Sequence, residues 1–522
     1  MTGVFRRQGR RRKAVSVLVA AALIALSGCG ARAVTGDFSP GPASSGQAAG
    51  APPVAPVAWK PCPDVIADVG QGQADARFSY SCGTVTVPQD WAKPTGPTFQ
   101  LELLRVRSKN QTNRIGSLLV NPGGPGASGL GLAVDLAGSI PAAVTGRFDL
   151  VGFDPRGIGR SAPVRCIPNP VKDQSTEQTV DPVSQSEFDQ QVTLSKRIGQ
   201  LCQQAYPNTL GLFSTEQTAR DLDAIRAGVG DSKITYLGFS YGTELGAVYA
   251  HLFPANIRAF VLDGAVDPQL TSVQSSEGQA AGFEKAFSNF AADCQQHAGS
   301  CPIGPDARGT VKRLLQQLKT NPIPLPDGRK LTDGLAFTGV IQALYAKSLW
   351  PVMASAVAET LSGSPQRLLQ LADEYNGRQQ DGSYNNEVDA NTTVNCDDDS
   401  ETLTVDKVRQ LQSQWRSKYP LMGAPLAMSL LGCVVWPTKR DPYQIGAATG
   451  APPIVVVGTT NDPATPYQNT ARLAKLLGTG VVLTWQGEGH TAYPQTQCIR
   501  TAVDDYLIDG KVPAPNTICP NN

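Results

Sequence analysis

The pentapeptide Gly238-Phe239-Ser240-Tyr241-Gly242 has the Gly-x-Ser-x-Gly pattern that surrounds many activated serines. It follows the apolar run 234–237, which predicts a strand, and it precedes a helical pattern over residues 243–253. A sharp turn from strand to helix exposes a serine hydroxyl, and the helix N-terminus stabilises negative charge that develops there. The pattern therefore predicts that Ser240 is a nucleophile. The alternative is a glycine-rich packing turn.

A nucleophilic serine needs a base, usually histidine, and the chain contains only three histidines. His251 lies in the helix after Ser240, about three turns away, and does not fold back onto it. His297 lies in a segment expected to be a solvated loop. His490 follows the apolar run 481–485 near the C-terminus, where the chain order serine, acid, histidine places the base. We therefore predict that His490 is the general base.

The acid that orients the imidazole should follow a strand and lie between the serine and the histidine. Asp462 follows an apolar run and precedes His490 by 28 residues. Asp263 and Asp267, after an earlier apolar run, are the alternatives. Glu488 is too close in sequence to His490 for this role. Asp462 is the predicted acid.

A glycine-rich loop, Asn121-Pro122-Gly123-Gly124-Pro125-Gly126, follows the apolar run 117–120. Glycines let the backbone approach a substrate closely. We expect the N–H groups of Tyr241 and of Gly123 or Gly124 to form the oxyanion hole. A phosphate-binding loop is the alternative, but the segment lacks the Lys-Ser/Thr ending of a P-loop.

The composition excludes several classes of protein. The 522 residues include 45 Lys and Arg against 44 Asp and Glu, which argues against a nucleic-acid binder. Glycine and proline are not periodic, so the chain is not a fibre, and 41% hydrophobic residues suffice for a core. No Cys-x-x-Cys pair occurs and the histidines are scattered, so we expect no metal, and no organic cofactor is implied.

The first 28 residues have the composition of a leader. A basic cluster at residues 6–13 precedes an apolar stretch at 14–26, which is too short to span a membrane permanently. The stretch ends in Leu26-Ser27-Gly28-Cys29, which resembles a bacterial lipobox. We expect removal of residues 1–28, lipidation of Cys29 and a location on the extracytoplasmic face of the cell membrane or envelope. The alternative is an ordinary leader with an incidental cysteine.

Removal of the leader has two consequences. It takes away six positive charges and leaves a formal net charge of about −5. The segment 29–58, rich in Ala, Gly, Pro and Ser, is then expected to be a tether.

Ten cysteines remain besides Cys29, and an exported protein meets an oxidising environment in which disulfides form. The sequence does not fix their connectivity. Neighbours along the chain suggest the pairs Cys62–Cys82, Cys166–Cys202, Cys294–Cys301, Cys396–Cys433 and Cys498–Cys519.

Short apolar runs alternate with helical patterns from residue 59 onward. These runs are continuously apolar, as in strands covered on both faces, and they predict an α/β fold with a mostly parallel sheet. The alternation stops at residues 273–447, which are mainly helical in pattern. This stretch is therefore predicted to be a domain inserted between two parts of the core, 59–272 and 448–522. The predicted strands are 101–106, 117–120, 148–153, 234–237, 259–262, 454–457 and 481–485.

Five motifs together resemble those of the secreted tripeptidyl aminopeptidases of actinobacteria, in the prolyl-aminopeptidase-like group of α/β-hydrolases. The resemblance covers about residues 59–519 and is closest to mycobacterial cell-envelope lipoprotein serine proteases, also described as carboxylesterases. The motifs are NPGGPGASG, GFDPRGIGRS, GFSYGTELG, NDPATP and GEGH.

The resemblance implies an α/β-hydrolase fold with a helical cap that narrows the cleft and selects free N-termini. It places Ser240, Asp462 and His490 in the catalytic triad. Asp154 and Arg156 match the Asp-Pro-Arg-Gly loop of the family and are expected to brace loops around the site. Prolyl aminopeptidases usually have His where this chain has Asn121, so release of single prolines is not implied.

The expected activity is hydrolysis through an acyl-enzyme, with release of short peptides of the tripeptidyl type from N-termini. The expected partners are peptide or protein substrates and, through Cys29, the membrane; no nucleic acid is expected. Two alternatives are a carboxylesterase or lipase that acts on envelope or exogenous esters, and a non-catalytic binding lipoprotein.

An exopeptidase needs a carboxylate in the cap to bind the substrate ammonium. Glu244, in the helix after Ser240, is expected to be a local hydrogen-bonding group rather than this carboxylate. The possible ammonium-binding acids are Asp397, Asp398, Asp399, Glu277 and Glu284.

Overall fold

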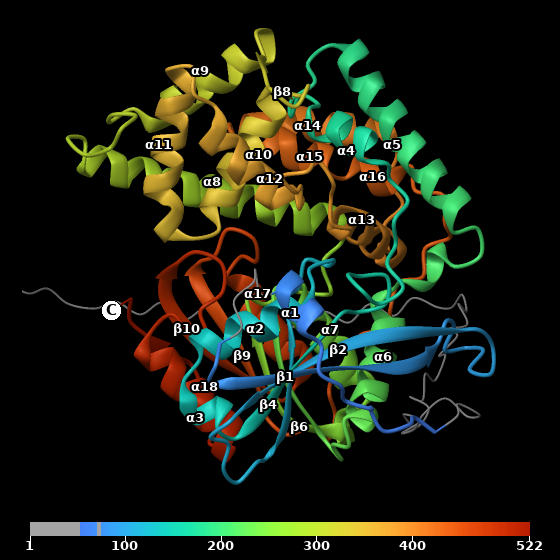
Figure 1. Cartoon of the computed structure of the whole chain (residues 1–522). Helices are drawn as coiled ribbons and strands as arrows, with labels where there is room; N and C mark the ends of the chain where they lie inside the picture. Colours follow the sequence, from blue (N-terminus) through green and yellow to red (C-terminus); the bar gives the residue numbers. More distant parts are fainter. Residues whose placement is uncertain (1–52, 70–74, 522) are drawn as a thin grey trace, which may run out of the picture. The chain divides into compact units, whose positions relative to one another are not determined.

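A nine-stranded sheet forms the centre of the computed structural model, which describes residues 53–69 and 75–521 (Figure 1). The strand order is β1-β2-β4-β3-β5-β6-β9-β10-β11. Only the β1–β2 and β2–β4 pairs are antiparallel, so the sheet is mostly parallel, as predicted. The strands are β1 (Phe78–Pro88), β2 (Thr98–Ser108), β3 (Gly116–Asn121), β4 (Phe148–Phe153), β5 (Ile234–Phe239), β6 (Ile257–Asp263), β9 (Ile454–Asn461), β10 (Gly480–Glu488) and β11 (Thr517–Cys519).

The sheet separates two hydrophobic clusters. On β3, Leu119 belongs to one cluster, while Leu118 and Val120 belong to the other, because side chains alternate between faces. The first cluster includes residues of α6 (Thr215–Gly228), α7 (Tyr241–Leu252) and α17 (Gln468–Leu477). The second includes residues of α2 (Gly129–Ser139), α3 (Ala142–Thr145) and α18 (Gln497–Asp509). Every residue of β3, β4 and β5 is therefore buried.

The chain leaves the sheet after β6 and returns at β9. The intervening residues are mainly helical, with one short hairpin of β7 (Ile323–Pro324) and β8 (Lys330–Leu331). The helices of this segment are α8 (Ser272–Gln296), α9 (Ala307–Thr320), α10 (Asp333–Leu344), α11 (Trp350–Leu361), α12 (Gln366–Asn376), α13 (Glu387–Asp398), α14 (Val405–Lys418), α15 (Gly423–Met428) and α16 (Leu431–Val434).

A second segment packs with these helices. It contains α4 (Asn169–Thr176) and α5 (Gln185–Ala205), between β4 and β5. Phe188 of α5 shares a hydrophobic cluster with Leu411 and Trp415 of α14. The group of helices that packs together therefore includes α4 and α5, which lie outside the predicted insertion 273–447.

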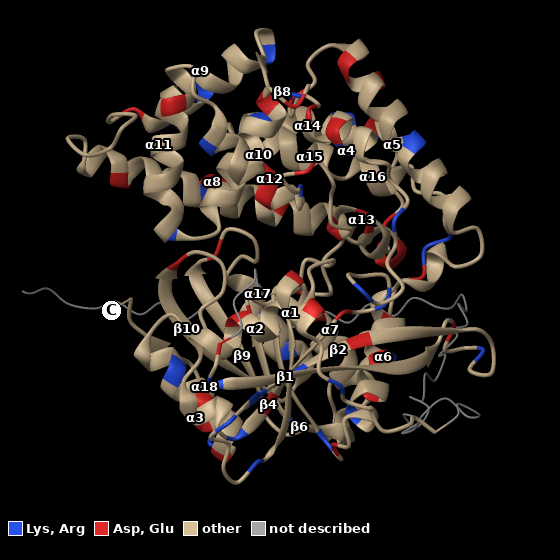
Figure 2. Ribbon diagram, viewed as in Figure 1, with Lys and Arg blue, Asp and Glu red and all other residues tan. Residues whose placement is uncertain are grey.

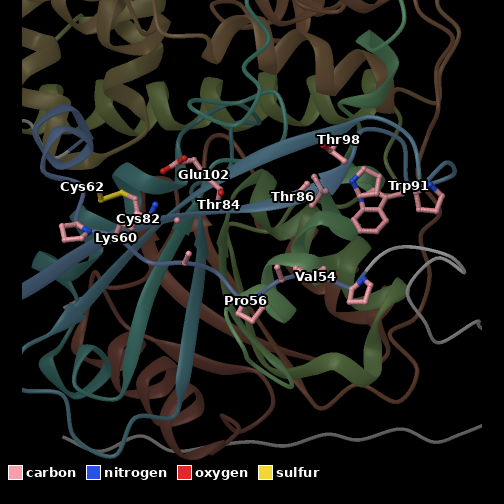
Figure 3. A pocket seen from close by; sticks show the side chains of 18 residues that line it. Val54, Pro56, Lys60, Cys62, Cys82, Thr84, Thr86, Trp91, Thr98 and Glu102 are labelled. Atoms are coloured by element: carbon pink, nitrogen blue, oxygen red, sulfur yellow. A yellow bond between two sulfur atoms is a disulfide. The ribbon is translucent and has the colours of Figure 1, made fainter.

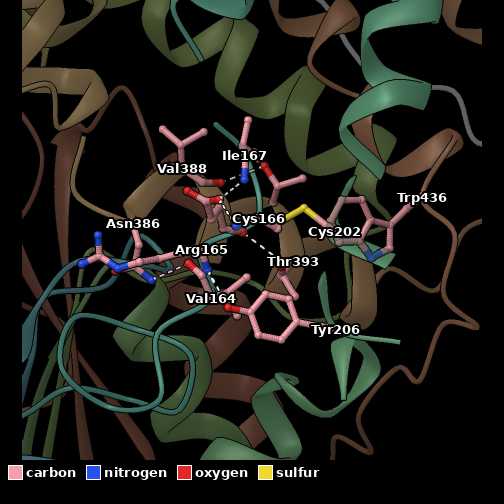
Figure 4. Close-up of a disulfide and its surroundings, with 12 residues drawn as sticks. Val164, Arg165, Cys166, Ile167, Cys202, Tyr206, Asn386, Val388, Thr393 and Trp436 are labelled. Atoms are coloured by element: carbon pink, nitrogen blue, oxygen red, sulfur yellow. Dashed lines mark hydrogen bonds between the residues drawn. A yellow bond between two sulfur atoms is a disulfide. The ribbon is translucent and has the colours of Figure 1, made fainter. Parts of the chain in front are cut away.

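Five disulfides connect the pairs suggested by sequence proximity. Cys166–Cys202 links the chain before α4 to the end of α5 (Figure 4). The bonds are Cys62–Cys82, Cys166–Cys202, Cys294–Cys301, Cys396–Cys433 and Cys498–Cys519.

The predicted leader 1–28, Cys29 and the predicted tether up to residue 52 lie outside the described residues. The last part of that tether packs on the core, where the Val57 N–H donates to the Gly228 carbonyl at 2.8 Å. A pocket lies between this segment and β1, lined in part by Val54, Thr86 and Trp91 (Figure 3). None of the predicted site residues lines it.

Within the described ranges, no helix has both the length and the apolar character needed to cross a membrane. Basic and acidic residues are interspersed over the elements (Figure 2).

Candidate active site

Ser240 occupies the tight turn between β5 and α7. Its φ of 54° and ψ of −124° are unfavourable for a residue with a Cβ, and such strain is typical of functional sites. Glycines flank Ser240 because the backbone on the two sides of the turn is close together. A Cβ on Gly238 would lie 2.4 Å from the Gly242 carbonyl oxygen. The local sequence thus forms the turn that Gly-x-Ser-x-Gly predicts.

His490 and Asp462 form a hydrogen-bonded pair. The His490 Nδ1 lies 3.0 Å from each carboxylate oxygen of Asp462. The backbone N–H groups of Ala464 and Thr465 each donate to Asp462 at 2.9 Å, which stabilises its charge. Burial disfavours the imidazolium of His490, but the charge and hydrogen bond of Asp462 outweigh this effect, so the pKa of His490 is raised.

The end of β6 connects this pair to Ser240. The Ser240 N–H donates to the Asp263 carbonyl at 2.9 Å. A Cβ on the next residue, Gly264, would lie 3.1 Å from the His490 Cε1. The imidazole and the serine turn therefore contact consecutive residues of one strand end.

Two residues that the sequence did not predict also hold the imidazole. Thr465 Oγ1 lies 3.0 Å from an Asp462 oxygen and 3.4 Å from His490 Nδ1. Tyr345, after α10, accepts the His490 backbone N–H at 2.7 Å, and its ring centroid lies 5.5 Å from the imidazole. Thr465 is three residues after Asp462 and could have been found by that spacing. Tyr345 has no local signal, because its contact joins distant segments.

The alternative acids have other partners. Asp263 accepts the backbone N–H groups of Ala492 and Tyr493, and burial raises its pKa to about 7. Asp267 accepts the Gln269 N–H at 3.1 Å.

The Glu488 carboxylate accepts hydrogen bonds from Asn289. Of the four acids considered for the imidazole, the structure brings Asp462 to His490.

The side chains of the other two histidines contact backbone carbonyl groups away from Asp462. His251 Nδ1 lies 3.1 Å from the Ala447 carbonyl, and His297 Nδ1 lies 2.9 Å from the Asp293 carbonyl.

The glycine loop after β3 lies against the serine turn. Gly123 has a φ of +94°, and a Cβ there would lie 2.9 Å from both the Ser240 Cβ and the Tyr241 nitrogen. The Gly123 N–H already donates to the Asn121 side chain at 3.0 Å. This geometry leaves the N–H groups of Gly124 and Tyr241 as the better candidates for an oxyanion hole.

Asp154 and Arg156 hold loops together. Arg156 is fully buried and forms an ion pair with Asp221 at 2.6 Å. Asp154 accepts hydrogen bonds from the Ser128 hydroxyl at 2.6 Å and the Arg160 N–H at 2.8 Å. Their contacts are those expected of bracing residues.

Three of the predicted ammonium-binding acids are already paired with cations. Asp399 lies 2.9 Å from Arg440, Glu277 lies 2.8 Å from Lys418, and Glu284 contacts Arg308.

Asp397 and Asp398 have neutral partners instead. Asp397 accepts hydrogen bonds from Thr438 at 2.7 Å and Trp436 at 3.3 Å, and burial raises its pKa to about 7. Asp398 accepts the hydroxyl of Thr215 at 2.6 Å, and burial raises its pKa well above the usual range.

Glu244 is a local hydrogen-bonding group, in agreement with the sequence-based expectation. It binds the hydroxyl of Tyr443, and burial raises its pKa to about 7.

Comparison with known proteins identifies relatives along nearly the whole chain. The family model described as "TAP-like protein" matches residues 419–519. Serine protease Hip1 of Mycobacterium tuberculosis is 37% identical, over 89% of this chain and 91% of its own length. Carboxylesterase B of the same species is 37% identical, over 91% and 92%. The tripeptidyl aminopeptidase of Streptomyces lividans is 31% identical, over 84% and 83%. The chain therefore belongs to the family of α/β-hydrolase-fold serine hydrolases that includes these three enzymes.

Proposed function

We propose that this protein is an exported serine peptidase that releases short peptides, of the tripeptidyl type, from the N-termini of its substrates. His490 accepts the proton of Ser240 as the hydroxyl attacks the scissile carbonyl, and Asp462 stabilises the imidazolium. His490 then protonates the leaving amine. Water hydrolyses the acyl-enzyme by the same acid–base exchange.

The oxyanion of each tetrahedral intermediate needs fixed donors. The N–H of Tyr241 supplies one, and the loop Gly123-Gly124 supplies the other. Since Gly123 already donates to Asn121, Gly124 is the preferred donor within this loop.

One observation carries the proposal: the Asp462–His490 pair contacts the strand end that also receives the N–H of the strained Ser240. A fluorophosphonate probe tests the nucleophile directly. Labelling should be lost in Ser240→Ala and kept in Ser186→Ala, a control at an exposed serine. An unlabelled wild-type protein would instead indicate a non-catalytic binding protein.

Matched tripeptide amides with free and acetylated N-termini test the exopeptidase activity. The free substrate should be hydrolysed faster, because an ammonium-binding carboxylate distinguishes the two. Equal turnover of both would contradict an exopeptidase.

A carboxylesterase is the second candidate, favoured by the similarity to carboxylesterase B. The same triad cleaves esters and amides, so the surrounding helices determine the preference. Fast turnover of acyl esters with no turnover of free tripeptide amides would favour this candidate.

Export and anchoring are part of the proposal. The five disulfides suit an oxidising compartment, and the lipobox-like sequence supports acylation at Cys29. Expression of the full chain in an actinobacterial host should place the protein in the membrane fraction. Cys29→Ala should release it, whereas an unchanged distribution would contradict the lipid anchor.

A further inference from the structure

The first residue of α13, Glu387, packs against the glycine loop of the candidate site. A Cβ on Gly126 would lie 2.7 Å from the Glu387 carbonyl oxygen and 3.2 Å from its Cγ. The Asn391 side chain donates to the Pro125 carbonyl at 2.9 Å. Since Gly126 has a φ of +120°, the loop and the start of the helix fit closely only with glycine at this position.

The residues next to Glu387 in the chain hold its backbone in place, and Figure 4 shows one of them, Asn386, beside Val164. Asn386, only 3% exposed, donates to the carbonyls of Gly157 and Val164 at 2.7 and 3.0 Å. Asp389 is fully buried, accepts the Cys166 N–H at 2.9 Å and pairs with Lys172 at 2.5 Å. Glu387 is therefore presented by a rigid support, as a binding group requires.

Two tyrosine rings follow one another from the imidazole. The ring of Tyr345 lies 5.5 Å from that of His490 and 6.1 Å from that of Tyr375. The pKa of both tyrosine hydroxyls is raised. Burial is the largest cause, and the negative charge of Glu387 is a smaller one. Tyr375 nevertheless keeps 42% of its surface exposed. Part of the Tyr375 side chain is thus accessible to a ligand.

Glu387 lacks a cation among the described residues. Its one side-chain donor is the Asn385 amide, at 3.5 Å. The side chain is half-buried, and burial raises its pKa. A carboxylate in such a place gains from a positive ligand, because the long hydrogen bond from Asn385 replaces only part of its lost hydration. Glu277 and Glu284 differ, since each already has a basic partner.

The length of the loop limits the distance between Glu387 and the nucleophile. Gly123 contacts Ser240, and Gly126 contacts Glu387. Three Cα–Cα steps separate the two glycines, a span of at most about 11 Å. Three extended residues of a substrate span at most about 10 to 11 Å.

We propose that Glu387 binds the free N-terminal ammonium of the substrate, beside the rings of Tyr345 and Tyr375, so that the third peptide bond reaches Ser240. This assignment rests on the exopeptidase function proposed above. The carboxylate supplies the charge-assisted hydrogen bond, and the tyrosine faces add cation–π attraction.

The test compares kcat/KM of Glu387→Gln and wild type on a tripeptide amide with a free N-terminus and on its N-acetyl analogue. The variant should lose about 10- to 100-fold on the free substrate, mainly through KM, and be unchanged on the acetylated one. Glu374→Gln, at an exposed acid of α12, is the matched control and should change neither. Fluorophosphonate labelling of Ser240 reports that each variant is folded.

The rival acids are tested in the same way with Asp398→Asn and Glu244→Gln. If the wild type prefers the free substrate and only a rival variant removes this preference, the assignment to Glu387 is wrong while the exopeptidase stands. If the wild type has no preference, both proposals fail.

Should Glu387→Gln not fold, Glu387→Asp replaces it. Its carboxylate is one methylene farther from the substrate, so kcat/KM on the free substrate alone should fall; an unchanged value would overturn the assignment.

Discussion

At the scale of single residues, Asp462 controls the charge state of His490. In the proposed mechanism the imidazole must be neutral to accept the proton of Ser240, so activity should fall as the pH drops through the pKa of His490. Asp462 raises that pKa, and Asp462→Asn should therefore move the acid limb of kcat/KM to lower pH. It should also reduce kcat by about 10⁴-fold, because the imidazole loses its orienting charge. Ester hydrolysis measured across pH provides both quantities.

Asp263→Asn is the control for this prediction, since Asp263 is the nearby buried acid without a hydrogen bond to the imidazole. The kcat of Asp263→Asn should remain much higher than that of Asp462→Asn. The reverse order would make Asp263 the orienting acid.

Gly123 has no room for a side chain. An alanine Cβ would lie 2.5 Å from the Phe239 carbonyl oxygen and would push against Ser240, at a φ that alanine avoids. Gly123→Ala should displace the loop that carries the proposed donor, the Gly124 N–H, and lower kcat by about 10²- to 10³-fold, the size of a lost oxyanion donor. Gly138→Ala, where no atom lies within 4 Å of the added Cβ, is the control and should retain activity. Equal kinetics of the two variants would contradict a role of this loop in catalysis.

Much of the candidate site could be predicted from the sequence, because the motif and the scarcity of histidine restrict the choice. Asp462 is the acid predicted from the sequence, with Asp263, at the end of another strand, as an alternative. The contact of Asp462 with His490 distinguishes the two. Glu387 and Tyr345 escaped prediction. Their neighbours in space, Gly126 and His490, are far away in the chain.

At the scale of elements, α13 joins the helical segment to the core. Asn386→Ala removes two hydrogen bonds to buried carbonyls and should lower the free energy of unfolding by about 1–3 kcal/mol. It should also weaken hydrolysis of free tripeptide amides more than that of esters, because the support of Glu387 loosens. Urea unfolding and the two substrate assays measure these effects. Asn395→Ala, at an exposed position of the same helix, should have little effect on either.

The elements themselves show where sequence patterns succeed. All seven predicted strands lie within observed ones. Six of them are in the parallel part of the sheet, where strands buried on both faces are rich in apolar residues, and the seventh, 101–106, lies in the antiparallel strand β2. β1 was missed because its side chains alternate between buried and exposed, as expected beside solvent. The packing of α5 with α14 could not be predicted either, because a helical pattern indicates an apolar face and not its partner.

At the scale of the whole molecule, the disulfides should contribute unequally to stability. A cross-link restricts the unfolded chain more when it closes a longer loop: Cys166–Cys202 spans 36 residues and Cys294–Cys301 spans 7. On the chain-entropy estimate, removal of the first by double substitution to alanine should cost about 4 kcal/mol, and removal of the second about 2 kcal/mol. Cys166 also donates its backbone N–H to Asp389, which helps to hold the start of α13. Removal of the Cys166–Cys202 bond should therefore also loosen the backbone around Glu387. Urea unfolding of the oxidised proteins gives both costs. An equal or reversed order would show that native packing, rather than the freedom of the unfolded chain, sets the contribution of these bonds.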